Sequence, residues 1–168
     1  MKEDLFRQDL RHVNTSSDSE VLLNVLAHEL QENVSNHQLD PAAIFAAVAG
    51  VHRRCRGAYA VVAMIAGYGL IAFRDPYGIR PLVIGYCDTE QGREYMVASE
   101  SVALDVLGFK LLRDVAPGGA ILVELDGKFH SQQCAANASL NPSNFEFVYL
   151  TRPDSVINGD SEYENRIR

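Results

Sequence analysis

Apolar side chains recur with helical spacing in the first third of the chain. Val21, Leu22, Val25, Leu26 and Leu30 follow one another at intervals of one, three and four residues, as on one face of an α-helix. A second stretch with this spacing starts at Asp40-Pro41, residue types favoured at an N-cap and at the first helical position. The sequence therefore predicts two consecutive helices.

The segment Thr-Ser-Ser-Asp-Ser-Glu, residues 15–20, is a strong start signal for the first helix. Ser17 and Glu20 have the spacing of a capping box, in which each side chain binds the backbone N–H of the other residue. Asp18 adds negative charge to the first turn, where the helix dipole stabilises it. We expect the helix to begin here.

From Gly57 onward the pattern indicates strands. The apolar runs 58–66 and 70–73 lack polar alternation, which predicts strands covered on both faces. Further strands are predicted at 82–86, 94–99, 110–114, 120–125, 128–133 and 145–151, with a short helix at 102–107. The polar tail after residue 158 is expected to be disordered or a half-formed helix. Helices followed by many antiparallel strands indicate an α+β domain in which helices cover the sheet.

Composition narrows the functional classes. The 168 residues suit one domain, and a net charge of −7 without a basic stripe argues against nucleic acid as a partner. Three cysteines without CxxC spacing give neither a disulfide framework nor a zinc site, which favours a reducing, cytoplasmic setting. No apolar stretch is long enough to cross a bilayer, so no membrane association is expected.

The most informative string is Arg-Asp-Pro-Tyr-Gly-Ile-Arg-Pro, residues 74–81. It lies between two apolar runs and is predicted to form a tight turn, since Pro76 fixes φ and Gly78 tolerates a positive φ. Arg74, Asp75 and Arg80 beside a buried sheet must satisfy one another or a ligand. Taken alone, these side chains favour a structural ion-pair turn.

This string and five others, in the same order along the chain, resemble amidophosphoribosyltransferases, glutamine-dependent enzymes of purine synthesis. The matching segments are residues 12–20, 56–59, 73–82, 96–101, 113–118 and 151–155. The resemblance implies a four-layer αββα sandwich of the N-terminal-nucleophile hydrolase type. It also implies that an N-terminal cysteine attacks the amide of glutamine, with its own amino group as the base. The released ammonia then displaces pyrophosphate from phosphoribosyl pyrophosphate in a second domain.

Several parts of the family pattern have no counterpart here. Met1 is followed by Lys2, and no cysteine precedes Cys55. We therefore expect an internal piece of the glutaminase domain, with an incomplete sandwich, that is inactive as it stands. Residues 1–155 are interpreted as the partial glutaminase domain. Residues 156–168 are interpreted as a polar tail leading toward an absent phosphoribosyltransferase domain.

The resemblance also implies roles for individual residues. Asp18 matches the aspartate that binds the α-amino group of glutamine, whereas without the resemblance we would interpret it as a helix cap. Arg74, Asp75 and Arg80 are expected to hold the turn and, secondarily, to shape the glutamine pocket. Ser17 and Glu100 are further candidates for support of the site, Glu100 as a cap or pair partner.

Cofactors and partners follow from the same resemblance. Some family members hold an iron–sulfur cluster on four cysteines, but one matching position is Ser143, a poor ligand, so no cluster is expected. No catalytic residue, metal or cofactor is assigned to this chain, and Mg²⁺ is expected only for the absent domain. The expected partners are glutamine, phosphoribosyl pyrophosphate and further copies of the same protein.

Two alternatives remain open at this point. The first alternative to an amidophosphoribosyltransferase is a glutaminase segment of another amidotransferase, such as asparagine synthetase, which shares the arginine-aspartate-proline turn. The second is a non-catalytic protein that binds glutamine or serves as a scaffold. Tight glutamine binding without ammonia release would favour the second alternative.

Overall fold

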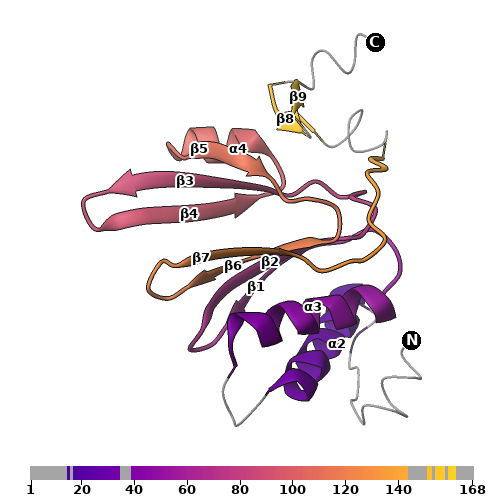
Figure 1. Ribbon diagram of the computed structural model, residues 1–168. Helices are drawn as coiled ribbons and strands as arrows, with labels where there is room; N and C mark the ends of the chain where they lie inside the picture. Colours follow the sequence, from indigo (N-terminus) through magenta and orange to yellow (C-terminus); the bar gives the residue numbers. More distant parts are fainter. Residues whose placement is uncertain are drawn as a thin grey trace. The chain divides into compact units, whose positions relative to one another are not determined.

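The computed structural model describes residues 15, 17–34, 39–143, 151–152, 154–157 and 159–161. The chain divides into two compact units, residues 1–56 and 57–168. Within the described residues, the first unit contains helices α2 (Asp18–Asn33) and α3 (Pro41–Arg54), and the second contains the strands and the short helix α4 (Ser101–Val106) (Figure 1). Among the described residues, no helix has the length and apolar character needed to span a bilayer.

The first unit is a pair of packed helices, α2 (Asp18–Asn33) and α3 (Pro41–Arg54). The start of α3 is as predicted, because the Asp40 carboxylate accepts a hydrogen bond from the Ala43 N–H at 2.7 Å and Pro41 is the first helical residue. The apolar faces bury Val21, Val25 and Leu26 on α2 and Ile44, Phe45, Val48 and Val51 on α3.

A partly buried ion pair joins the two helices. Glu29 of α2 accepts a hydrogen bond from Arg54 of α3 at 3.2 Å, and its side chain is only 12% exposed. Gly50 provides the room, since a Cβ atom there would lie 1.8 Å from Glu29 Oε2. The pair therefore requires a glycine in the middle of α3.

The second unit contains two main antiparallel sheets. The first sheet has the order β1-β2-β6-β7 and the second has the order β4-β3-β5. The strand bounds are β1 Ala60–Ile65, β2 Gly69–Arg74, β3 Val83–Thr89, β4 Gly92–Ala98, β5 Lys110–Asp114, β6 Gly119–Glu124 and β7 Phe129–Gln133. Helix α4 (Ser101–Val106) lies between β4 and β5 in the chain.

The two sheets face each other in this unit, as Figure 1 shows. Their facing sides supply one apolar core of Ala72, Leu82, Ile84, Val115 and Ile121, with Tyr95, Val97 and Phe129 packed against it. The rings of Tyr95 on β4 and Phe129 on β7 stack with their centroids 5.0 Å apart. The predicted α+β class with layered antiparallel sheets is confirmed.

Helix α4 packs directly on β3 because residue 85 has no side chain. The β3–β5 register shifts between Ile84 and Gly85. A Cβ atom at Gly85 would lie 2.9 Å from both Leu104 Cδ1 and the Lys110 carbonyl oxygen. Leu104 is thereby fully buried against the sheet.

Two strand predictions need correction. β2 is covered on both faces as expected, but β1 is an edge strand in which Val62 is 50% and Met64 78% exposed. The tail is not helical at residues 160–161, because β8 (Val156–Ile157) pairs with β9 (Asp160–Ser161). The strand predicted at 145–151 lies almost wholly outside the described residues.

Candidate functional site

Asp18 is the first residue of α2, and its side chain is exposed. The cap is Ser17, whose hydroxyl accepts a hydrogen bond from the Ser19 N–H at 3.3 Å. The predicted capping box between Ser17 and Glu20 is wrong in both bonds. The Ser17 hydroxyl binds the N–H of Ser19 instead of that of Glu20, and Glu20 accepts from the N–H and hydroxyl of Thr15 at 2.7 and 2.5 Å. Capping is thus performed by neighbours of Asp18.

The Asp18 carboxylate makes no hydrogen bond or ion pair with any other residue that the structure describes. It lies in the first turn of a 16-residue helix, where unpaired backbone N–H groups favour negative charge. A carboxylate in this position can accept charge-assisted hydrogen bonds from an ammonium group. From the sequence alone, we would interpret Asp18 as a helix cap. Since Ser17 is the cap, the Asp18 carboxylate is available to bind a ligand.

The turn after β2 is organised by Asp75, which is completely buried. Its carboxylate accepts hydrogen bonds from three backbone N–H groups, those of Tyr77 at 2.9 Å, Ile79 at 3.1 Å and Arg80 at 3.2 Å. These bonds replace the water that a carboxylate loses on burial. The turn, residues 74–81, is therefore closed by hydrogen bonds to the carboxylate of Asp75, its second residue.

Arg74, the last residue of β2, binds the same turn through carbonyl oxygens. Its guanidinium donates to Arg80 at 2.6 Å, Gly78 at 2.7 Å and Val115 at 3.0 Å, and the side chain is 1% exposed. Burial lowers the pKa of this guanidinium, while the charges of Asp114 and Asp75 oppose that shift. Three donors directed at three carbonyls fix both the turn and the chain beside it.

Gly78 allows the turn to close. Its φ is +59°, and a Cβ atom there would lie 2.9 Å from Pro117 Cγ. The turn is joined to two other loops, since Asp75 accepts from the Gly118 N–H at 2.9 Å and Tyr77 accepts from the Asn141 N–H at 2.7 Å, both through backbone carbonyl oxygens. The Arg80 side chain itself is exposed.

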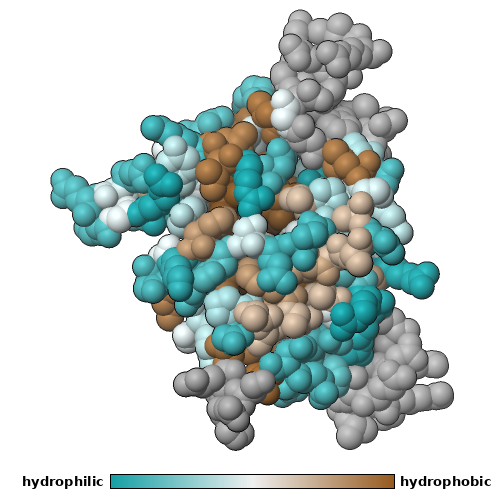
Figure 2. Space-filling view, viewed as in Figure 1, coloured by the Kyte–Doolittle hydropathy of each residue, from teal (hydrophilic) through white to brown (hydrophobic). Residues whose placement is uncertain are grey.

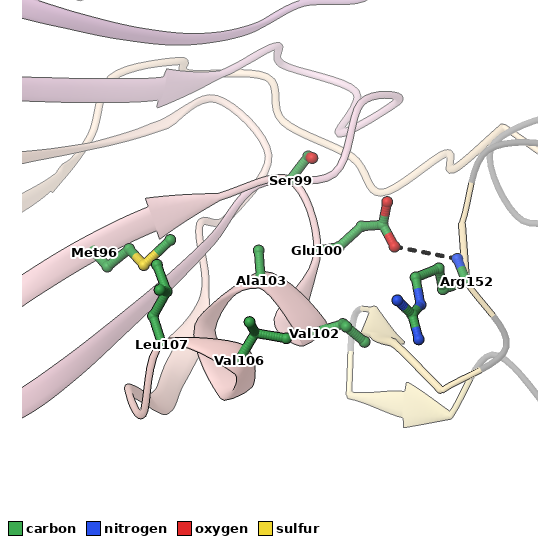
Figure 3. A pocket seen from close by; sticks show the side chains of 8 residues that line it. All are labelled: Met96, Ser99, Glu100, Val102, Ala103, Val106, Leu107 and Arg152. Atoms are coloured by element: carbon green, nitrogen blue, oxygen red, sulfur yellow. Dashed lines mark hydrogen bonds between the residues drawn. The ribbon is translucent and has the colours of Figure 1, made fainter.

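Glu100 precedes α4 but does not cap it, because its side chain makes no capping hydrogen bond. Oxygen Oε2 instead accepts hydrogen bonds from the Arg152 N–H at 3.1 Å and the Ser155 hydroxyl at 2.9 Å. The contact with Arg152 is drawn in Figure 3. The sequence leaves two roles for Glu100, helix cap or pair partner. The structure shows no cap, and the carboxylate instead accepts hydrogen bonds from a segment far away in the chain.

A shallow groove of about 450 Å³ lies beside this contact. Aliphatic side chains of β4, α4 and the residue after it form most of its lining, with Glu100 and Arg152 at one end (Figure 3). Val106 and Leu107 are 76% and 62% exposed, and Figure 2 shows hydrophobic surface in the region of α4. Sequence reasoning missed this groove, because it depends on Arg152, far away in the chain.

The candidate residues thus occupy three places. Ser17 and Asp18 lie in the first unit, at the start of α2. Arg74, Asp75 and Arg80 lie together in the turn after β2, and Glu100 lies at the start of α4. The structure groups the turn residues by direct hydrogen bonds.

Two of the three thiols, those of Cys55 and Cys134, are poorly suited to nucleophilic chemistry. Cys55 is 5% exposed, and burial raises the pKa of its thiol. Burial raises the pKa of Cys134 to about 11. Since the thiolate is the reactive form, neither group supplies a nucleophile at neutral pH. Within the described ranges, no group of three or more His, Cys, Asp or Glu side chains is arranged to hold a metal ion.

Comparison with known proteins identifies the family. A family model described as a glutamine amidotransferase domain matches residues 2–106, more than half of the chain. The chain belongs to the glutamine amidotransferase domain family. The resemblance inferred from the sequence strings is thereby confirmed, and the matched region includes Asp18, the Arg74–Pro81 turn and Glu100.

The similar proteins described next are amidophosphoribosyltransferases, also called glutamine phosphoribosylpyrophosphate amidotransferases. The chain is 56% identical to the amidophosphoribosyltransferase of Pseudomonas aeruginosa, over 100% of this chain and 33% of the relative. It is 55% identical to that of Escherichia coli, over 99% and 33%. The solved glutamine phosphoribosylpyrophosphate amidotransferase of B. subtilis, complexed with ADP and GMP, has a TM-score of 0.76 at 32% identity, over 98% of this chain and 32% of that one. The chain therefore spans about a third of the curated relatives it matches.

Proposed function

We propose that the chain is the glutamine-binding part of an amidophosphoribosyltransferase, which makes 5-phosphoribosylamine from phosphoribosyl pyrophosphate and glutamine in the first step of de novo purine synthesis. The main support is the 56% identity to an amidophosphoribosyltransferase over the whole chain. The relatives described above share that name, which favours this function over a segment of asparagine synthetase.

In this proposal Asp18 binds the α-amino group of glutamine. The carboxylate is exposed in the first turn of α2, and Ser17 rather than Asp18 caps the helix. One carboxylate can accept two or more N–H donors from an ammonium group, and such charge-assisted bonds are the stronger kind. Arg74, Asp75 and Arg80 support the site by holding the turn after β2 in one conformation.

The nucleophile is assigned to an N-terminal cysteine outside this sequence. It attacks the side-chain amide of glutamine, ammonia leaves, and water hydrolyses the acyl-enzyme to glutamate. The chain alone is proposed to be inactive, in keeping with the raised thiol pKa values of buried Cys55 and partly buried Cys134. Residues 1–155 would form part of the glutaminase domain, and residues 156–168 would lead toward the phosphoribosyltransferase domain.

The remaining assignments are also proposals. Mg²⁺ would act in the phosphoribosyltransferase domain together with phosphoribosyl pyrophosphate. An iron–sulfur cluster is not proposed, because the position that matches one of the four ligating cysteines of some family members is Ser143, and such a cluster needs thiolates. We place the whole protein in the cytoplasm as a homo-oligomer.

Calorimetric titration of the chain with glutamine, alongside an assay for released ammonia, tests the function. We expect binding without ammonia release. Asp18→Asn should weaken binding by roughly 1.5–3 kcal/mol, the value of a hydrogen bond to a charged group. The matched control is Asp105→Asn, which removes an exposed carboxylate from α4 in the other unit. Its affinity for glutamine should equal that of the unmodified chain.

The possible outcomes separate the alternatives. Unchanged affinity in Asp18→Asn would remove Asp18 from the glutamine site. Ammonia release above the buffer background would require another nucleophile and overturn the assigned roles. Binding in the nanomolar range without turnover would favour a glutamine sensor, and no binding at all would leave the chain without its proposed substrate site.

A further inference from the structure

The segment 151–157, here called the strap, is fastened to the start of α4 by three hydrogen bonds. The Arg152 N–H and the Ser155 hydroxyl donate to Glu100 Oε2 at 3.1 and 2.9 Å. The Val156 N–H donates to the Ser101 hydroxyl oxygen at 2.8 Å. The structure describes every residue of the strap except residue 153.

Several polar side chains at the fastening are buried, although the bond from the Arg152 N–H is exposed and the other two are partly buried. Ser101 is 4% exposed, Thr151 5% and Ser155 0%, so three polar side chains are buried here. Hydrogen bonds to a charged carboxylate are stronger than those between neutral groups, and a buried polar group that loses its partner is costly. Detaching one end of the strap would therefore leave buried polar groups along the rest of it without hydrogen-bond partners or expose them to water.

Two adjacent residues provide all three acceptor positions. Oxygen Oε2 of Glu100 receives two donors from the strap, and Ser101, the next residue, receives the third. The apolar core between the two sheets contains no strap residue. The three bonds thus converge on one place at the start of α4, while the sheets have a core of their own.

We propose that Glu100 and Ser101 form a latch that holds the strap as one cooperative unit with two states, docked on α4 and released. In the docked state, Arg152 forms one wall of the groove beside α4 (Figure 3). In the released state the groove loses that wall and the chain after Val156 is no longer directed by α4. The sheets stay folded in both states.

Amide hydrogen exchange followed by NMR tests the latch in the whole 168-residue chain. Glu100→Ala removes the acceptor of the Arg152 N–H, and Ser101→Ala removes the acceptor of the Val156 N–H. A cooperative latch predicts that each substitution lowers protection at both amides. The loss should be about ten-fold or more for Glu100→Ala, which removes a charged acceptor, and roughly three- to ten-fold for Ser101→Ala, which removes a neutral one. The amides of β2 report on the sheets and should keep their protection.

Arg152→Gln is the matched control, because it changes the side chain of the strap but keeps the backbone N–H that donates to Glu100. Both reporter amides should stay protected in this variant. If each substitution affects only the amide whose own acceptor is removed, the bonds are independent and the latch does not exist. Glu100→Gln serves as a second Glu100 variant, because it removes the charge but preserves the shape of the side chain. Loss of protection in β2 in both Glu100 variants would also overturn the proposal, since the strap would then be inseparable from the sheets.

Discussion

Arg74 and Asp75 bind the two backbone polar groups of the same residue, Arg80. Arg74 donates to its carbonyl oxygen at 2.6 Å, and Asp75 accepts from its N–H at 3.2 Å. Consecutive residues of the chain thus close the turn that follows them, one as donor and one as acceptor. Position 80 is held through its backbone, whereas positions 74 and 75 act through buried side chains.

Replacing Arg74 by methionine should strongly destabilise the second unit. The substitution leaves the carbonyl oxygens of Gly78, Arg80 and Val115 without their donor and removes the positive charge near Asp75. We expect the free energy of unfolding to fall by about 3–5 kcal/mol, the range for breaking a buried charged network. Urea unfolding followed by circular dichroism measures this change.

Arg93→Gln is the control for that experiment. Arg93 also pairs with a carboxylate, that of Asp88 at 2.7 Å, but both side chains are largely exposed. Surface pairs contribute little because water and salt screen them, and the guanidinium also lies 4.3 Å from the centroid of the Tyr86 ring, a contact that is weak at exposed sites. The free energy of unfolding should therefore fall much less than in Arg74→Met. Equal effects of the two substitutions would show that burial of Arg74 does not determine its contribution.

Gly50→Ala should have opposite effects on stability in two backgrounds. In the unmodified chain the new methyl group displaces Glu29, which loses its bond to Arg54. That loss of about 1.5–3 kcal/mol exceeds the helix-propensity gain of about 1 kcal/mol. In a Glu29→Ala background the three atoms nearest to the new methyl group are gone, and the same substitution should stabilise by about 0.5–1 kcal/mol. A double-mutant cycle from urea unfolding tests the change of sign, and two effects of equal sign would contradict it.

Ser17 and Asp18 should separate stability from ligand binding. Ser17→Ala removes the acceptor of the Ser19 N–H, so the free energy of unfolding should fall by about 1 kcal/mol. Asp18→Asn leaves the cap intact and should cost less than about 1 kcal/mol, through the helix dipole alone. Thermal unfolding gives both values. A larger loss in Asp18→Asn than in Ser17→Ala would assign the structural role to Asp18.

Cys134 should react slowly with thiol reagents. Burial raises its pKa from an ordinary 9.0 to about 11, so at pH 8 the thiolate is about a hundred-fold scarcer than in an unfolded chain. Iodoacetamide labelling followed by peptide mass spectrometry measures the rate in folded and urea-unfolded protein. Because the folded pKa is the higher one, this group lowers stability as pH rises from 9 to 11. Equal labelling rates in the two states would contradict the protonated thiol.

Local signals predicted the helices well. Asp40-Pro41 marks the start of α3 because a cap depends only on residues within one turn, and the Asp40–Ala43 hydrogen bond forms as expected. The start of α2 was predicted equally well, although Glu20 binds Thr15 instead of completing a box with Ser17. Both partners were within a few residues, and the sequence alone does not choose between them.

Non-local features were harder to predict. The apolar run of β1 resembles a buried strand, yet every second side chain of this edge strand is exposed, so one of its faces is uncovered, which the run does not encode. The partners of Glu100 lie 52 and 55 residues later in the chain. The turn residues 74, 75 and 80 were predicted as a group because they are close in sequence, and the groove beside α4 was missed because Arg152 is not.

The absence of a side chain at position 85 has an effect far along the polypeptide. A methyl group there would press on Leu104 and on the carbonyl oxygen of Lys110, and the carbonyl belongs to the neighbouring strand and has little freedom to yield. Helix α4 would be lifted from β3, and Glu100 and Ser101 would move with it. The missing side chain of Gly85, in the middle of β3, thus helps to determine where the strap, more than 60 residues later in the chain, attaches to α4.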